Sequence, residues 1–371
     1  MTTILRASDS AEFLGIVPVL AGFTPTRSIV LLPFIGARAY GAMRLDLPDD
    51  ESDPATYAAA AIGLVTRVDG VDGVAIVVYP DDGPARTGDG LVLPLGVQVD
   101  ELIGSADDAG LRIVDALCVC AGGWASYLDD DPELAPTAPS PTAPLVGDVS
   151  GDQLAGVDLP RADLGEKERV GRALLDVAEI LDRGKHGPLT GRENPQAIAA
   201  IAMLEDLPEF FELLLDAPES QPAFATAALL WCLARPVFRD VALTQWASDR
   251  RGGVRTLSAQ LAFSGTGRMV PDDLTGIFLG RGPTPDPDRL RLALAVVRLA
   301  AARAPRELRP GPLTAAAWLS WALGRSTHAA HYLDLVRSID PQHGLAELLN
   351  AIVSDGLLPE WAFRRGAGRP T

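Results

Sequence analysis

Three acidic side chains lie near the ends of segments that the sequence predicts to be strands. Asp46 lies near the end of an alternating segment, and Asp81 and Asp82 follow a short apolar run. If these strands are parallel neighbours, their carboxyl ends meet at one edge of the sheet, where ligands of open α/β folds bind. Carboxylate oxygens there could hold a hard cation such as Mg²⁺. The alternative, which we favour, is that these acids are solvated loop residues of an acidic protein.

Three further side chains complete this candidate crevice. Arg44 could grip an anionic ligand, although with Asp46 it could equally form a surface ion pair of little energetic weight. Trp124 follows the last predicted strand, and its indole could stack on a planar ligand. The candidate ligand-binding residues are therefore Arg44, Asp46, Asp81, Asp82, Trp124 and Tyr127. The catalytic residues stay unknown, because no Ser-His-Asp or Cys-His arrangement can be singled out.

A second group of candidates lies on two helices predicted near the C-terminus. Trp318 and Trp321 precede Gly324, and the next helix closes on an Asp-Pro pair, a pattern that loosely resembles a tetratricopeptide-like hairpin. Such hairpins commonly present a groove to a partner segment. The alternative, which we favour, is that both tryptophans belong to the core of a small bundle. We keep them as candidate partner-binding residues.

Two histidines on the second of these helices extend this candidate partner surface. His328 and His331 are three residues apart, so they share a helix face, and this spacing can bind a transition metal. No third strong ligand lies nearby in the sequence, so a polar helix face is the favoured interpretation and no metal site is predicted.

The first 128 residues alternate between predicted strands and helices. A helix begins at Asp53-Pro54, and a weaker one covers about 97–109. Apolar or alternating runs predict four strands, over 29–34, 39–47, 74–79 and 111–120. This order predicts an α/β domain with a mixed, mostly parallel sheet: strands two, three and four are parallel, and the first is antiparallel to the second.

The remaining chain is predicted to be a linker followed by an all-helical domain. Residues 129–163 are interrupted by prolines and show no sustained period, which indicates a linker. From 164 to 371 the period is helical, and one helix is expected to begin at Asp286-Pro287. The first helix carries a clean apolar stripe, made of Val170, Ala173, Leu174, Val177, Ile180 and Leu181.

Composition excludes several classes of protein. The net charge is −17, from 49 acidic and 32 basic residues, which disfavours general nucleic-acid binding. Three cysteines are too few for a disulfide framework and fit a reducing compartment. No signal peptide and no apolar run of about 20 residues is found, so we expect a cytoplasmic protein that does not enter a membrane.

Several short motifs resemble one known family. They are Val17-Pro18-Val19-Leu20-Ala21-Gly22-Phe23-Thr24-Pro25, Ser28-Ile29-Val30, Arg44-Leu45-Asp46-Leu47-Pro48, Trp124-Ala125-Ser126-Tyr127, Trp318-Leu319-Ser320-Trp321-Ala322-Leu323-Gly324, Asp340-Pro341 and Leu345-Ala346-Glu347-Leu348-Leu349. In this order they are similar to the actinobacterial family named domain of unknown function 4192. The resemblance implies an actinobacterial origin, which suits the scarcity of lysine, and it implies no activity.

Two hypotheses about function follow from these patterns. The first is a non-catalytic interaction or regulatory protein that binds a protein partner through its helical domain, because no strong catalytic constellation is present. The alternative is a small-molecule or nucleotide-binding enzyme or sensor that uses the acidic crevice at the strand ends. The sequence predicts neither a cofactor nor an oligomeric state.

Overall fold

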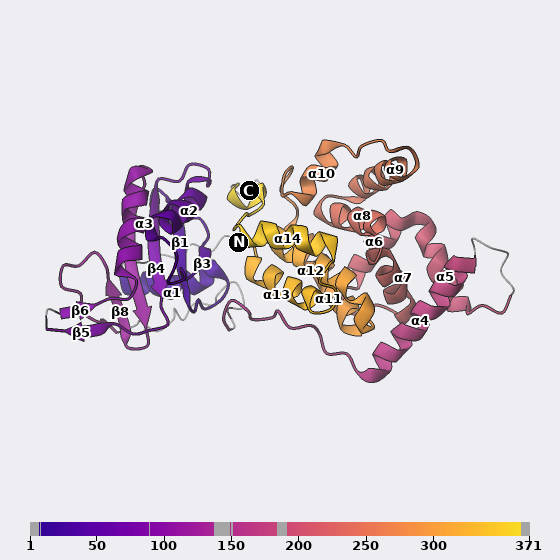
Figure 1. Ribbon diagram of the computed structural model, residues 1–371, viewed down its shortest axis with the longest axis horizontal. Helices are drawn as coiled ribbons and strands as arrows, with labels where there is room; N and C mark the ends of the chain where they lie inside the picture. Colours follow the sequence, from indigo (N-terminus) through magenta and orange to yellow (C-terminus); the bar gives the residue numbers. More distant parts are fainter. Residues whose placement is uncertain are drawn as a thin grey trace. The chain divides into compact units, whose positions relative to one another are not determined.

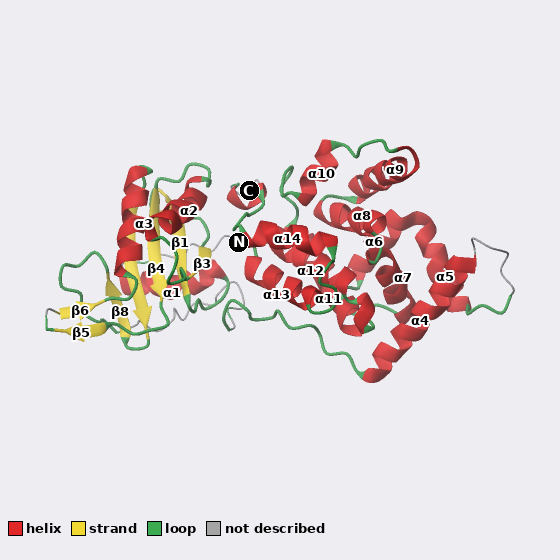
Figure 2. Ribbon diagram, viewed as in Figure 1, coloured by secondary structure: helices red, strands yellow, loops and turns green. Residues whose placement is uncertain are grey.

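The chain forms two compact units that divide between Ala155 and Gly156. The computed structural model describes residues 7, 9–88, 90–136, 149, 151–183 and 191–364. The first unit carries all the described strands, and the second is built of helices (Figure 1, Figure 2).

A mixed sheet forms the centre of the first unit. Its order is β2-β1-β4-β7-β8, and β3 pairs with part of β1 beside β2. The strands are β1 (Ser28–Ile35), β2 (Arg38–Ala39), β3 (Met43–Asp46), β4 (Gly73–Tyr79), β7 (Arg112–Cys120) and β8 (Gly123–Ser126). A separate small hairpin joins β5 (Ala85–Thr87) to β6 (Gly90–Val92).

The prediction that this sheet is mostly parallel is wrong. Among the described strands, β4 and β7 are the parallel pair, whereas β1 is antiparallel to β2, β3 and β4, and β8 is antiparallel to β7. The antiparallel pairing of the first two predicted strands is confirmed. The error has a physical reason: β1 and β4 are both buried on both faces, so they pair at the centre of the sheet, and β1 lies between β3 and β4.

Helices cover both faces of this sheet, and alternate residues of β1 supply the two cores. Ile29 and Leu31 pack towards α2 (Pro54–Thr66) and α3 (Gly96–Asp108). Val30 and Leu32 pack on the other face with α1 (Ser10–Ala21). The period of two along a strand produces this division.

The predicted linker over 129–163 is only partly described, since 137–148 and 150 lie outside the described residues. Its last part is held by the first unit. Gln153 Oε1 accepts from the Thr26 backbone at 3.3 Å and from its hydroxyl at 3.1 Å, and Gln153 Nε2 donates to the Thr26 carbonyl at 3.1 Å. Residues near 153 therefore belong to the edge of the α/β unit.

The second unit holds its own first residues in the same way. Arg298 donates to the carbonyls of Gly156, at 2.6 Å, and Asp158. The Tyr332 hydroxyl donates to the Val157 carbonyl at 2.8 Å, and the Val157 side chain is buried in the helical core. These contacts hold the first residues of the helical unit, from Gly156 to Asp158, in place.

Eleven α-helices lie in the described part of the second unit. They are α4 (Leu164–Arg183), α5 (Pro195–Met203), α6 (Leu207–Asp216), α7 (Ala223–Leu233), α8 (Pro236–Ala247), α9 (Arg250–Thr266), α10 (Asp272–Phe278), α11 (Pro287–Arg303), α12 (Pro310–Ala322), α13 (Ser326–Arg337) and α14 (Gly344–Ser354). The predicted start of α11 is confirmed, because Asp286 caps it by accepting from the Asp288 backbone. No helix in the described ranges is long and apolar enough to cross a membrane.

Helix α12 lies at the centre of this unit, and every residue along it is buried. Its indoles donate to carbonyls at the ends of other segments: Trp318 Nε1 to Phe278 at 3.2 Å, and Trp321 Nε1 to Leu357 at 2.7 Å. Trp361 donates back to Ala322 at 2.9 Å. The indole N–H of each of these three tryptophans therefore has a hydrogen-bond acceptor. This removes the main free-energy cost of burying a tryptophan.

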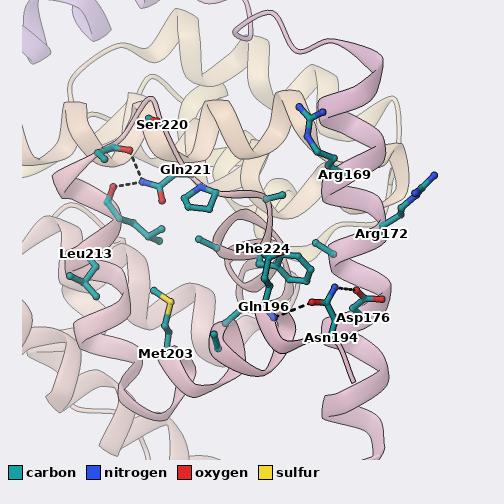
Figure 3. Close-up of a pocket in the computed structure, with 18 of the residues that line it drawn as sticks. Arg169, Arg172, Asp176, Asn194, Gln196, Met203, Leu213, Ser220, Gln221 and Phe224 are labelled. Atoms are coloured by element: carbon teal, nitrogen blue, oxygen red, sulfur yellow. Dashed lines mark hydrogen bonds between the residues drawn. The ribbon is translucent and has the colours of Figure 1, made fainter. Parts of the chain in front are cut away.

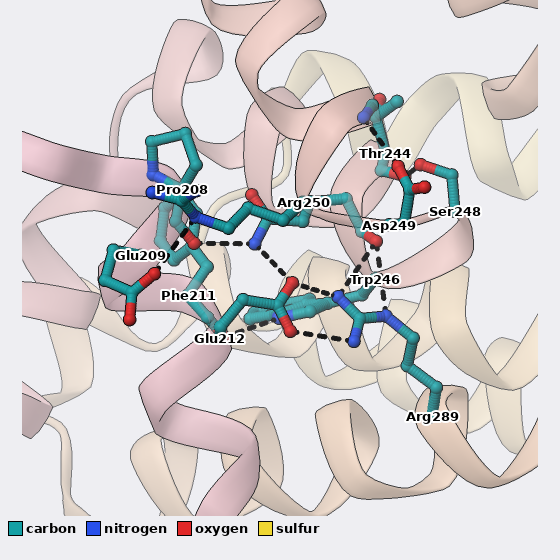
Figure 4. Close-up of polar contacts among 12 residues, drawn as sticks. Pro208, Glu209, Phe211, Glu212, Thr244, Trp246, Ser248, Asp249, Arg250 and Arg289 are labelled. Carbon is teal, nitrogen blue, oxygen red and sulfur yellow. Dashed lines mark hydrogen bonds and ion pairs between the residues drawn. The ribbon is translucent and has the colours of Figure 1, made fainter.

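A polar network joins three helices around this core (Figure 4). Arg289 of α11 faces the Glu212 carboxylate of α6 and donates to it through two nitrogens, one at 2.9 Å. Gln245 of α8 donates to the same carboxylate and to the Pro208 carbonyl, each at 2.7 Å. Although burial alone would raise the pKa of Glu212, these hydrogen bonds and the arginine charge lower it overall.

Candidate interaction groove

Two of the three acidic residues predicted at the strand ends, Asp46 and Asp81, form ion pairs with arginines, and Asp82 is exposed without one in the described residues. Ser28 of β1 stands opposite both Asp46 and Tyr79, so β3 and β4 end at one edge of the sheet. Asp46 accepts from Arg44 at 2.5 Å, and Asp81 pairs with Arg27 at 2.7 Å. Within the described residues no three His, Cys, Asp or Glu side chains gather closely enough to hold a metal ion. The Mg²⁺ site considered for Asp46, Asp81 and Asp82 is therefore not formed.

The two aromatic candidates of the crevice lie elsewhere. Three strands, β1, β4 and β7, separate β8 from β3, so Trp124 is remote from Asp46. Trp124 packs on the α1 face of the sheet, whereas Tyr127 packs on the α2 and α3 face and donates to the Pro94 carbonyl at 2.6 Å. Burial raises the pKa of Tyr127. The structure does not bring the six predicted residues together.

The tryptophans predicted to contact a partner are enclosed. Trp318 is 0% exposed and packs against Phe278, with 5.7 Å between ring centroids. Trp321 is equally buried, and His328 on α13 is buried as well. His331 is half-buried, and its ring forms a T-shaped contact with Tyr332. Both indoles therefore lie inside the helical unit, where other helices surround α12.

A different surface of the helical unit is open. Four helices, α4 to α7, surround a groove of about 1080 Å³. Small side chains form much of its lining: Ala173, Ala199, Ala200, Ala217, Ala223 and Ala225. Larger apolar side chains are added by Leu175, Met203, Leu213 and Phe224, with Met203 and Leu213 on one side and α4 on the other (Figure 3).

Three of these larger side chains are well exposed. Leu175 of α4 is 71% exposed, Leu213 of α6 is 46% exposed, and Met203 at the end of α5 is 36% exposed. Single exposed apolar residues are ordinary on protein surfaces, but several around one concave, apolar surface mark a binding site. The groove is therefore the strongest candidate site in the described helical unit.

Polar groups at the edges of the groove are fixed in place. Asn194 donates to the Asp176 carboxylate at 2.8 Å and caps α5 through its other amide atom. Gln221 donates to the carbonyls of Leu214, at 2.8 Å, and Ala217, at 2.7 Å, at the end of α6. These bonds shape the groove before any ligand arrives.

The groove also has a basic edge on α4, where Arg169 and Arg172 project (Figure 3). Arg172 forms an ion pair with Glu168 on the same helix. Arg169 has no ion-pair partner in the described part of the chain. A bound partner with an acidic group near α4 would neutralise the positive charge of this edge.

Sequence reasoning missed this groove, although one signal was available. The apolar stripe predicted on α4 is buried as expected, with Val170, Ala173 and Val177 nearly inaccessible. Leu175 falls off that stripe, among charged residues. A leucine on the polar face of an otherwise clean amphipathic helix indicates a second contact surface.

Comparison with known proteins identifies the family. Residues 11–275 and 284–360 match the family described as domain of unknown function DUF4192, and the chain belongs to it. The match extends over parts of both units. No protein of curated function and no solved structure was found to be similar to the chain.

Proposed function

We propose that this protein is a non-catalytic interaction protein that binds a protein partner in the groove between α4 and α7. The observation that carries the proposal is the exposure of Leu175, Met203 and Leu213 around one apolar concavity. Leaving these side chains in water costs free energy in proportion to their apolar area, and a partner that covers them recovers it. The proposal includes a cytoplasmic location, supported by the three free cysteines.

The occupant we propose is an amphipathic helix of the partner. Such helices bind grooves through large apolar side chains repeated on one face. The alanines that line the groove leave room for such side chains, and its 1080 Å³ exceeds what one small ligand usually fills. The free charge of Arg169 favours an acidic residue at one end of that helix.

The predicted tetratricopeptide-like hairpin enters this proposal as support for the groove. We propose that α12 and α13 form such a hairpin, with Gly324 at φ +76° in the turn between them. Because α12 is buried along its length, the hairpin would stabilise the helical unit, and the partner would bind elsewhere.

Site-specific photo-crosslinking in the native host tests this function. The full chain would carry p-benzoylphenylalanine in place of Met203, and the product would be analysed by mass spectrometry. We expect one partner, crosslinked through a segment with apolar residues at helical spacing. A synthetic peptide of that segment should then bind the full chain in calorimetry.

Matched variants make the result specific to the groove. Leu213→Asp should abolish both the crosslink and peptide binding. Leu261→Asp, at a 55% exposed leucine of α9 outside the groove, should leave both unchanged. The proposal is overturned if no partner crosslinks, if the crosslinked segment lacks an apolar face, or if the two variants behave alike.

A further inference from the structure

We propose that a second cavity, at the start of α4, binds a small molecule that carries a diphosphate group. This cavity has a volume of about 510 Å³, within the range of small-molecule sites. Its lining comes from the segment before α4, the first turn of α4, the last turn of α11 and the residue before α12: Leu159, Pro160, Arg161, Ala162, Asp163, Lys167, Ala302 and Arg309. It is separate from the groove, with which it shares no lining residue.

Three cations line this cavity: Arg161, Lys167 and Arg309. None of them forms an ion pair with any residue in the described ranges. Arg309 does donate to the Ala304 carbonyl through Nε, at 3.2 Å, but its two terminal nitrogens have no such bond. The cavity therefore concentrates positive charge that the protein itself leaves unpaired.

Cations without an ion pair, such as Arg169, occur elsewhere in the described chain, but here three of them line one cavity. In a chain with 49 acidic and 32 basic residues, three cations without a described carboxylate partner around one cavity form a local concentration of positive charge. Neighbouring Arg303 does form an ion pair, with Glu166 at 2.8 Å, in a largely buried setting. The three cations of the cavity form no such pair among the residues described, although Lys167 is directly next to Glu166 in the sequence.

The one acid in the lining, Asp163, already has another role. Its Oδ1 accepts from the Glu166 backbone at 2.7 Å, while its own N–H donates to Glu166 Oε2 at 3.1 Å. This reciprocal capping box closes the first turn of α4 and uses both carboxylates. Asp163 therefore offsets only part of the positive charge, and the mutual repulsion of the three cations favours an anion between them.

The side chains suit phosphate oxygens in particular. A guanidinium can bind two phosphate oxygens at once, and a lysine adds a point charge. Two arginines and one lysine provide enough donors for two phosphate groups. Leu159, Pro160 and Ala302 add an apolar wall that a non-phosphate part of the ligand could contact. A free diphosphate and a nucleoside diphosphate share this chemistry.

Isothermal titration calorimetry of the full chain with pyrophosphate, and in parallel with ADP, tests the inference. We expect saturable 1:1 binding of at least one probe, weakened by salt. Tighter binding of ADP would show that the apolar wall contributes, whereas equal affinity would assign recognition to the diphosphate alone. The absence of saturable binding of either probe at millimolar concentration would overturn the proposal.

Two single variants and one matched control assign the binding to this cavity. Lys167→Gln and Arg161→Gln should each raise the dissociation constant about tenfold, which corresponds to about 1.4 kcal/mol. Arg268→Gln removes a charge from an exposed loop after α9, outside the cavity. It should change the dissociation constant less than twofold. Melting curves without ligand should be the same for all three variants. Equal losses from Arg268→Gln and Lys167→Gln would show general charge attraction and overturn the site.

Discussion

Helix α12 and the groove between α4 and α7 are both apolar surfaces of one helical unit, yet the first is enclosed and the second is open. Along α12 every side chain is buried, and tryptophan N–H groups are satisfied by carbonyls of other segments. Around the groove, Leu175 and Leu213 remain exposed and no described segment covers them. Apolar character alone therefore does not distinguish a core helix from a docking surface.

The difference comes from what surrounds each surface. Phe278 at the end of α10 and Trp361 in the last described segment pack around the indoles of α12. Between α4 and α7, six of the nineteen lining residues are alanines, whose short side chains leave the space open. Small residues facing one another leave a cavity that a partner can fill. Four changes test this comparison, in order of decreasing effect on the free energy of unfolding.

The largest effect is expected from Trp318→Ala. The indole is fully buried, so its removal leaves a cavity and an unpaired Phe278 carbonyl. We expect the free energy of unfolding to fall by about 3–5 kcal/mol, measured by urea denaturation. Trp231→Ala is the control, because Trp231 is only half-buried beside Phe238. This substitution should lower the free energy of unfolding clearly less. Equal losses would mean that α12 is not the centre of the unit.

Gly311→Ala tests how closely α12 approaches α7. A Cβ at Gly311 would lie 2.8 Å from the Leu233 carbonyl oxygen, and backbone atoms cannot move aside cheaply. We expect a loss of about 1–3 kcal/mol in the free energy of unfolding. Gly265→Ala, in α9 with nothing within 4 Å, is the matched control and should stabilise slightly through helix propensity. If both substitutions changed the free energy of unfolding in the same direction, the close approach of α12 to α7 would be contradicted.

Glu212→Gln removes the charge at the centre of the network that joins α6, α8 and α11. Because Glu212 is partly exposed, we expect a loss of about 1 kcal/mol at pH 7 in chemical denaturation. The direction in which this stabilisation changes with pH follows from the lowered pKa of Glu212. The folded-state pKa lies below its ordinary value of 4.5, so this stabilisation is present above 4.5 and is lost as the pH falls through the folded-state pKa.

The difference between wild type and Glu212→Gln should therefore be constant from pH 7 to about 5.5 and shrink at lower pH. A difference that grows on acidification would show that burial outweighs the Arg289 contact. Neither result depends on a partner, which separates this test of the scaffold from the test of the groove.

Local patterns predicted many of the elements, because they depend on neighbouring residues. The apolar runs at 29–34 and 74–79 become β1 and β4, and Asp286-Pro287 begins α11. The sheet order could not be predicted in this way. Whether β1 stands beside β3 alone or between β3 and β4 depends on contacts between residues about 45 positions apart, which no local period encodes.

The candidate site was less predictable than the fold for a related reason. A groove forms where the side chains of several helices do not contact one another. The sequence of a single helix does not show where this happens. Leu175 was visible as an exception on α4, but Leu213 on α6 becomes informative only when it is known to lie on the same groove. The sequence left two interpretations of the tryptophans open, because large aromatic residues serve both cores and interfaces.

The smallest effect on stability is expected from a substitution of Leu213 in α6, and the neighbouring Leu214 provides the sharpest contrast. Leu213 is exposed to solvent in the groove, whereas Leu214 is 1% exposed and packs in the core. Leu213→Ser should change the free energy of unfolding by less than about 0.5 kcal/mol, while Leu214→Ser should lower it by more than about 3 kcal/mol. Denaturation curves of both variants measure this directly. If Leu213→Ser destabilises as strongly as Leu214→Ser, the side chain is part of the core, and the groove is closed in solution. If the expected difference is found, Leu213 is held at the surface at no benefit to folding, and its apolar area is available to a partner.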